Sequence, residues 1–168
     1  MTYTCTIETP LGAMTAAAEN EALIGLWFIG QKYYPTIVPR WICEPDYPVF
    51  TALRHRLSRY FSGKEEGYDL QLAPHGSPFR KAVWDALARI PFGQTVTYGA
   101  IAREIACTQG LSAMSAQAVG GAVGHNPLTI LIPCHRVVGV NGRLTGYAGG
   151  LDRKEALLRL EGVITPAG

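Results

Sequence analysis

The sequence predicts two domains in tandem. Residues 1–76 are expected to form a small α/β domain, an antiparallel sheet with one helix. Residues 77–168 are expected to form a mainly α-helical domain that contains a helix-turn-helix. Three observations support this division: strand-like segments with turn signals at the start, a polar connector near residue 70, and a series of amphipathic segments with capping residues after it.

The first domain is expected to contain three strands and a helix. Residues 2–8 are rich in Thr, Tyr and Ile, a Thr-Pro-Leu-Gly turn follows, and residues 13–18 can pair back as a hairpin. Residues 22–29 form a third apolar strand. Residues 49–61 carry apolar side chains at helical spacing, and the polar connector over residues 64–76 marks the domain boundary.

The second domain begins with a clear helix signal, because Ser77 is a candidate N-cap and Pro78 stands at the first helical position. Thr97 can cap a short helix over residues 98–106, and a second short helix follows over residues 115–124. Two short helices joined by a turn suggest a helix-turn-helix whose second helix approaches DNA. From the pattern alone this signal is weak, since many small domains contain such a pair.

The remaining segments surround a chemically notable tetrapeptide, Pro133-Cys134-His135-Arg136. Residues 128–132 are a continuous apolar run, which indicates a buried strand or extended segment. Asn-Gly at positions 141 and 142 predicts a hairpin over residues 137–147. Residues 151–161 are expected to form a last helix, whose core-facing residues are Ala156, Leu157 and Leu160.

Composition indicates a soluble globular protein: of 168 residues, 48% are hydrophobic and 17% charged. No leader-like segment or long apolar run occurs, so a cytoplasmic protein is expected, with access to the nucleoid in a bacterium and no membrane association. The four cysteines are widely spaced, which argues against a disulfide framework and against a zinc site, and no metal is expected. Residues 77–168 are modestly basic, which alone is weak evidence for a phosphate-contacting surface.

The second short helix has an unusual composition, because it is dominated by small residues: Ala116, Ala118, Gly120, Gly121, Ala122 and Gly124. Glycine costs about 1 kcal/mol per helical position relative to alanine. Such a helix is favoured only where another backbone must approach closely. Tight packing inside the protein and close contact with DNA explain this equally well.

Cys134 beside His135 suggests nucleophilic chemistry. The thiolate is the reactive form, and a free cysteine with a pKa of about 8.5 needs a neighbouring base or positive charge at neutral pH. However, buried single cysteines are usually inert, and adjacent side chains on an extended segment point in opposite directions. The dipeptide alone therefore leaves catalysis and a structural role open.

The longer string Ile132-Pro133-Cys134-His135-Arg136-Val137-Val138 resembles the acceptor-cysteine motif of the O6-alkylguanine-DNA alkyltransferases (methylated-DNA–[protein]-cysteine S-methyltransferases). Further matches follow in order and in approximate spacing over residues 77–162, whereas residues 1–76 resemble the family loosely. The matching segments are Phe79–Trp84, Thr97-Tyr98-Gly99, Ala118-Val119-Gly120-Gly121-Ala122, Asn126-Pro127, Gly146-Tyr147-Ala148-Gly149-Gly150, Lys154-Glu155 and Leu160-Glu161-Gly162. The resemblance implies a ribonuclease-H-like first domain and a winged-helix-like second one.

The resemblance also implies a reaction and roles for catalytic residues. Cys134 would accept a methyl or larger alkyl group from O6 of guanine, once and irreversibly, as a single-turnover suicide enzyme of DNA repair. His135 would take the thiol proton through a water, and Glu161 would orient that histidine. Asn126 would tie the recognition helix to the active-site segment. Tyr98 would press on the target phosphate and donate a proton to the departing guanine. Each of three assignments has a competing structural explanation. Tyr98 could pack on the core, Glu161 could be an ordinary exposed residue near a helix end, and Asn126 could simply end a helix before Pro127.

The implied partner is double-stranded DNA containing O6-alkylguanine, bound in the minor groove by a monomer that flips the base out of the duplex. No cofactor is implied. Gln117, Ala118 and Gly121 would contact DNA, as would Arg136, and Val137, Tyr147 and Ala148 would line the base pocket. Gln117 stands where the family usually has an arginine that fills the gap left by the flipped base, and the turn between the short helices is several residues longer than usual. Acceptance of O4-methylthymine stays open.

Three other functions share some of these sequence features. An alkyltransferase-like damage sensor would bind alkylated guanine without repairing it, but members of that group lack the acceptor cysteine that this chain retains as Cys134. A transcription factor with a helix-turn-helix would need no nucleophile. A cysteine hydrolase would need further signatures that the sequence does not show.

Overall fold

The computed structural model describes residues 1–37, 39–64 and 70–163. These divide into two compact units. The first unit comprises Met1–His75 together with Pro127–Thr129, and the second comprises Gly76–Asn126 and the residues from Ile130 onward. Part of the expected connector over residues 64–76 lies outside the described residues.

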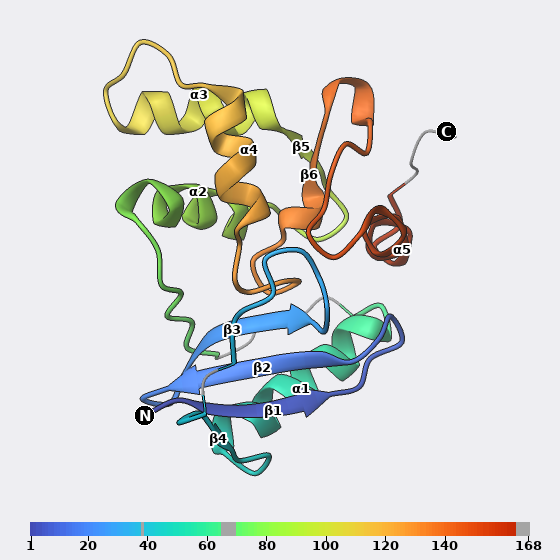
Figure 1. Cartoon of the computed structure of the whole chain (residues 1–168). Helices are drawn as coiled ribbons and strands as arrows, with labels where there is room; N and C mark the ends of the chain where they lie inside the picture. The colour runs from blue at the N-terminus through green and yellow to red at the C-terminus, as the bar shows by residue number, and fades with distance from the viewer. Residues whose placement is uncertain (38, 65–69, 164–168) are drawn as a thin grey trace. The chain divides into compact units, whose positions relative to one another are not determined.

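The first unit is built on a four-stranded sheet with strand order β3-β2-β1-β4 (Figure 1). Its elements are β1 (Tyr3–Ile7), β2 (Met14–Glu19), β3 (Ala22–Phe28), β4 (Ile42–Cys43) and α1 (Pro48–Phe61). β1, β2 and β3 form the antiparallel meander that the sequence predicts. The turn after β1 is closed by the Thr9 hydroxyl, which donates to the Gly12 carbonyl at 2.7 Å.

The sheet is mixed rather than purely antiparallel, because β4 pairs with β1 in parallel. Residues 29–41 connect β3 to β4, and this connection is long enough to carry the chain across to the far edge of the sheet. The two-residue length and exposure of β4 explain why no strand was expected there. Bridges from Leu72 and Leu128 to β3 extend the other edge.

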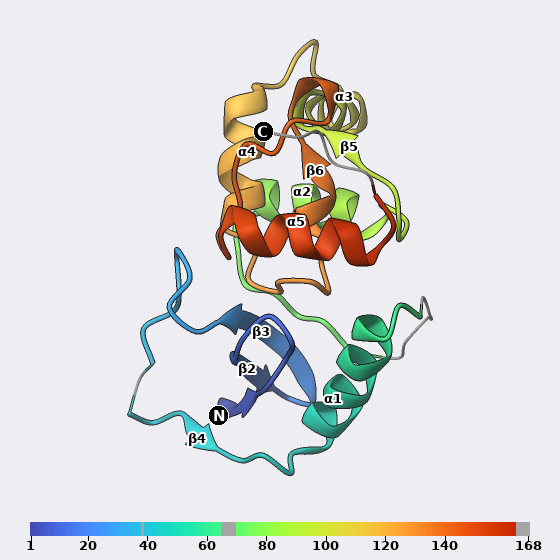
Figure 2. The same cartoon turned by 90° about the vertical axis from the view of Figure 1, so that its right-hand side faces the viewer.

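Both faces of the sheet are covered within the first unit. α1 lies along one face, as Figures 1 and 2 both show, and buries Phe50, Leu53 and Leu57. On the other face Trp27 packs against Tyr34, whose hydroxyl is 2.7 Å from the Thr15 hydroxyl. This double coverage explains why an alanine-rich segment forms the buried strand β2, since burial outweighs its modest strand propensity.

The second unit is mainly helical. Its elements are α2 (Pro78–Ala88), β5 (Val96–Thr97), α3 (Tyr98–Thr108), α4 (Ala116–Gly124), a 3₁₀ turn (Cys134–Arg136), β6 (Val137–Val138), a second 3₁₀ turn (Val140–Gly142) and α5 (Leu151–Leu160). α2, α3 and α4 pack against one another (Figure 2). The indole nitrogen of Trp84 on α2 donates to the Ala122 carbonyl of α4 at 2.8 Å.

The capping residues at the helix starts are confirmed. The Ser77 hydroxyl accepts from the Arg80 amide, and the Thr97 hydroxyl from the Ala100 amide. Ser115 caps α4 in the same way. Each cap satisfies one of the amide groups that a helix leaves without an internal partner, which contributes about 1 kcal/mol. Residues 109–115 connect α3 to α4.

Two expected strands were wrong. Residues 128–132 form a tight turn with Ile130 at a φ of 74°, because an apolar run shows burial but does not specify strand geometry. Residues 143–147 do not pair with β6, which joins β5 in parallel instead. Asn141 and Gly142 do adopt positive φ, and the Gly139 amide donates to the Arg143 carbonyl, so the turn forms without its strands.

The buried face of α5 also differs from the expected one. Leu157 is buried as predicted, but its buried neighbours are Leu158 and Lys154 rather than Ala156 and Leu160. Lys154 has no exposed surface.

Candidate active site

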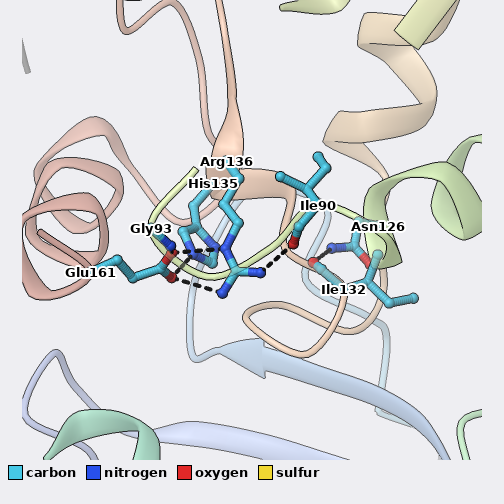
Figure 3. A network of polar contacts seen from close by, with 7 residues as sticks. All are labelled: Ile90, Gly93, Asn126, Ile132, His135, Arg136 and Glu161. Atoms are coloured by element: carbon cyan, nitrogen blue, oxygen red, sulfur yellow. Dashed lines mark hydrogen bonds and ion pairs between the residues drawn. The ribbon is translucent and has the colours of Figure 1, made fainter. Parts of the chain in front are cut away.

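Cys134, His135 and Arg136 form a 3₁₀ turn between the residue 127–133 segment and β6. All three side chains are buried; Cys134 is 6% exposed and Arg136 8%. In an extended segment, His135 and Arg136 would point in opposite directions. The turn removes that alternation, so both side chains reach Glu161 (Figure 3).

Glu161 orients His135. The residue caps the C-terminal end of α5, and its Oε2 is 2.6 Å from Nε2 of His135, both side chains being fully buried. Burial by itself raises the pKa of Glu161, but hydrogen bonds from His135 and Arg136 and the charge of the histidine lower it to about 2. Since the carboxylate is ionised, it accepts, and Nε2 of His135 carries the donated proton. The lone pair of a neutral His135 then lies on Nδ1.

Burial lowers the pKa of His135, while Glu161 acts in the opposite direction. His135 is therefore neutral and basic at physiological pH. An orienting carboxylate joined to a neutral imidazole next to a thiol has the composition of a nucleophile–base–orienter set. The alternative in which Glu161 is an ordinary exposed residue does not hold, because Glu161 lies inside the second unit.

Arg136 holds the same carboxylate from the other side. Its Nε donates to Oε1 of Glu161 at 2.8 Å and its Nη2 to Oε2 at 3.1 Å. Its Nη1 donates to the Ile90 carbonyl at 2.7 Å, as Figure 3 shows. The position of Arg136 does not favour the DNA contact expected from the sequence, because its guanidinium lies in this internal network.

Burial raises the pKa of the Cys134 thiol, so the protonated form is favoured. A hydrogen bond from the Asn126 side chain and the positive charge of Lys154 act in the opposite direction. Asn126 follows α4 and donates from Nδ2 to the Ile132 carbonyl at 2.7 Å, which joins the end of α4 to the segment before Cys134 (Figure 3). The thiol therefore needs a base to become a nucleophile.

Tyr98 lies at the first position of α3 and is partly buried. Burial raises the pKa of its hydroxyl, and a hydrogen bond with the Thr145 side chain opposes this rise. The hydroxyl therefore keeps its proton at neutral pH. The ammonium group of Lys154 lies 5.9 Å from the centre of the Tyr98 ring, within the range of a cation–π contact.

Lys154 is a site residue to which sequence reasoning assigned no role. Its Nζ donates to the Val137 carbonyl at 2.6 Å and to the Gly146 carbonyl at 2.8 Å, which links β6 to the loop before α5. Burial lowers its pKa to about 8, and the charge of Cys134 opposes this. The available signal was its spacing: Lys154 stands three and four residues before the buried Leu157 and Leu158, on the apolar face of α5.

Replacing Lys154 by methionine is expected to raise the pKa of the Cys134 thiol, because the positive charge that lowers this pKa is lost while burial is kept. The rate of Cys134 alkylation by iodoacetamide, followed by peptide mapping from pH 6 to 11, measures this pKa without DNA. Replacing partly buried Arg153, one residue earlier on α5, by methionine removes a neighbouring positive charge that does not shift the pKa of Cys134 and serves as the matched control. An unchanged Cys134 profile in the Lys154 variant would show that the ammonium does not support the thiolate.

The expected DNA-contacting residues lie in three different environments. Gln117, Ala118 and Gly121 are exposed along α4. Tyr147 and Ala148 are partly buried, and Val137 is completely buried. A Cβ added at Gly121 would meet nothing within 4 Å, and one at Gly120 would meet only a Tyr98 ring carbon at 4.0 Å. Internal packing therefore does not require these glycines.

Within the described ranges, no group of three or more His, Cys, Asp or Glu side chains could hold a metal ion. The same ranges contain no helix long and apolar enough to cross a membrane.

Comparison with known proteins assigns both halves of the chain. Residues 1–74 match the family model described as 6-O-methylguanine DNA methyltransferase, ribonuclease-like domain. Residues 78–163 match the model described as 6-O-methylguanine DNA methyltransferase, DNA binding domain.

Individual relatives and solved structures agree with this assignment. A methylated-DNA–protein-cysteine methyltransferase of Methanosarcina acetivorans is 41% identical over 160 residues, which cover 95% of this chain and 98% of the relative. One from Mycobacterium tuberculosis is 42% identical, covering 96% of this chain and 93% of the relative. The crystal structure of M. tuberculosis OGT in complex with DNA is 40% identical with a TM-score of 0.84, covering 98% of this chain and 96% of that one. The chain therefore belongs to the 6-O-methylguanine DNA methyltransferase family.

Proposed function

We propose that this protein repairs DNA by transferring a methyl or larger alkyl group from O6 of guanine to the sulfur of Cys134. The observation that carries the proposal is the buried His135–Glu161 pair directly after the buried Cys134, found in a member of a family whose relatives are named methylated-DNA–protein-cysteine methyltransferases. The carbon–sulfur bond forms as the carbon–oxygen bond breaks. The thioether is not reversed, so each molecule reacts once.

The thiol proton leaves before or during the attack. Because burial keeps Cys134 protonated, a base must take that proton, and His135 is neutral and oriented by Glu161. Its Nδ1, the nitrogen not bonded to Glu161, accepts the proton through a water molecule. Lys154 and Asn126 then stabilise the thiolate at the moment of displacement.

The departing guanine needs a proton or a strong hydrogen bond as the O6–alkyl bond breaks. Tyr98 provides it from the start of α3, since its raised pKa keeps the hydroxyl protonated. The Lys154 ammonium beside the Tyr98 ring stabilises the tyrosinate that forms. Val137, Tyr147 and Ala148 line the pocket that receives the guanine.

The second unit, residues 77–168 in the sequence-based division, carries the DNA contacts through α3 and α4 as a helix-turn-helix. The exposed small residues of α4, among them Ala118 and Gly121, allow its backbone to approach the minor groove closely. Gln117, an exposed residue near the start of α4, enters the duplex where the flipped base leaves. Its amide can hydrogen-bond to the orphaned cytosine, although it lacks the charge of the arginine usual in the family. The protein acts as a monomer and without a cofactor.

Replacing Gly121 by alanine is expected to stabilise the free protein by up to about 1 kcal/mol while weakening DNA binding. Alanine favours the helix and meets no neighbour inside the protein, but its methyl group occupies the space needed by the DNA backbone. Urea unfolding and fluorescence anisotropy with a duplex measure the two effects. Replacing exposed Ser58 on α1 by alanine is the control, since it raises helix propensity outside α4. Unchanged or tighter DNA binding by the Gly121 variant would contradict the assigned face.

The proposed function is tested from the DNA side by incubating a duplex that contains one O6-methylguanine with increasing amounts of protein and no added cofactor. Enzymatic digestion and chromatography of the nucleosides then give the repaired fraction. We expect guanine to replace O6-methylguanine in a one-to-one ratio with protein. Lesion-selective binding without loss of the methyl group would identify a damage sensor instead, and neither binding nor repair would exclude both functions.

A further inference from the structure

The proposed reaction gives Arg136 no task, although its buried guanidinium makes three side-chain hydrogen bonds. Its guanidinium donates through Nε and Nη2 to Glu161 and through Nη1 to the Ile90 carbonyl, at 2.7–3.1 Å. The carbon of the guanidinium also lies 5.8 Å from the centre of the Phe92 ring. Burying an arginine is costly unless its charge and donors are all satisfied, so this position needs an explanation.

The Glu161 carboxylate accepts more hydrogen bonds than it would need only to orient His135. Its Oε1 accepts from Arg136 and from the Gly93 amide at 3.0 Å, and its Oε2 accepts from His135 and again from Arg136. In a nucleophile–base–orienter triad, the negative charge of the orienting carboxylate stabilises the imidazolium that forms when the histidine takes the proton. Here that charge is compensated by a bidentate arginine (Figure 3).

We propose that Arg136 is a positioning residue for the transfer reaction: it fixes the Glu161 carboxylate and neutralises its charge, so that His135 stays unprotonated and able to accept the proton of Cys134. The inference rests on the proposed function, because it names the charge control of the same site.

Three charged groups face His135, besides the Cys134 thiol. Glu161, at the end of α5, raises its pKa, whereas Arg136 on the same 3₁₀ turn and Lys154 on α5 lower it. Burial lowers it further and is the largest cause. Removing the arginine would leave Glu161 facing His135 alone, and the imidazole would be protonated at a higher pH. A proton already on His135 must then leave before the Cys134 proton can be accepted.

The test compares wild-type protein with Arg136→Met and Arg136→Lys. Single-turnover methyl transfer from an O6-methylguanine duplex is measured from pH 5 to 9, and the titration of His135 is followed by NMR in the free protein. In the methionine variant we expect the acidic limb of the rate profile and the His135 titration to move up together by about one pH unit or more. In the lysine variant, which keeps the charge, both should stay near those of the wild type. If Arg136 only supported the fold, both variants would have a lower plateau rate of methyl transfer, and the acidic limb of the pH–rate profile would not move.

A double variant distinguishes an electrostatic effect from a loss of folding. The double variant Arg136→Met/Glu161→Gln removes both charges, so His135 should titrate at a lower pH than in Arg136→Met alone. Coincident titration of His135 in wild type, Arg136→Met and the double variant would overturn the inference. If the NMR shift is present but no variant or wild-type protein transfers methyl, the charge control stands and the proposed function fails.

Discussion

Replacing Glu161 by glutamine is expected to lower the free energy of unfolding by about 3–5 kcal/mol. The substitution keeps the shape of the side chain but leaves Arg136 buried with no counter-charge and with a donor amide nearby. Urea unfolding of the two proteins measures the difference. Because His135 also loses its orienting acceptor, we expect methyl transfer to slow as well.

A matched control lies on the same helix. Glu155 forms an exposed pair with Arg159 at 2.8 Å, one turn apart on α5. Replacing Glu155 by glutamine removes the same charge but is expected to cost at most about 0.5 kcal/mol, since surface pairs contribute little. Equal losses in the Glu155 and Glu161 variants would show that the buried network does not stabilise the fold.

The Glu161 substitution also changes the acid sensitivity of the protein. The pKa of Glu161 is about 2 in the folded protein against an ordinary 4.5. Its stabilising contribution is therefore complete above pH 4.5 and is lost as the pH falls toward 2, with a total of about 3 kcal/mol. The stability gap between wild type and the Glu161→Gln variant should narrow over this window. A gap that stays constant from pH 5 to 2.5 would contradict the lowered pKa.

Replacing Cys134 by alanine is expected to abolish alkyl transfer while preserving the fold and binding to the lesion. The substitution removes the acceptor sulfur but leaves His135, Glu161 and the exposed residues of α4 in place. Single-turnover assays and anisotropy with an O6-methylguanine duplex measure both properties. Replacing Cys107, an exposed cysteine on α3, by alanine is the control and should leave transfer intact. Transfer by the Cys134 variant would place the acceptor elsewhere.

The sequence predicted much of the fold where local signals are strong. Ser77 and Thr97 act as N-caps as predicted, and the meander of the first unit follows its turn residues. The parallel strand β4 and the turn over residues 128–132 were not predicted, because both are set by packing between distant segments. A short exposed strand and an apolar run leave no distinctive periodicity.

The site was predicted in part. The resemblance of the motif named Cys134, His135 and Glu161 as candidates, but the dipeptide alone could not show that a 3₁₀ turn brings His135 and Arg136 to one carboxylate. The placing of Arg136 among the DNA contacts could not take its burial into account, because the internal partners of its guanidinium, Glu161 and the Ile90 carbonyl, come from distant segments. The sequence gives little sign that Lys154 is buried, because lysine is rarely fully buried and the two carbonyls that accept from its ammonium group belong to Val137 and Gly146.

The most direct test of the account is the mass of the protein after reaction. The intact protein is weighed after incubation with a duplex carrying one O6-methylguanine and is then digested for peptide mapping. The account predicts a gain of one methylene per molecule, located on Cys134, with no further gain when the duplex is in excess. An unchanged mass, or a methyl group on Cys5, Cys43 or Cys107, would contradict it.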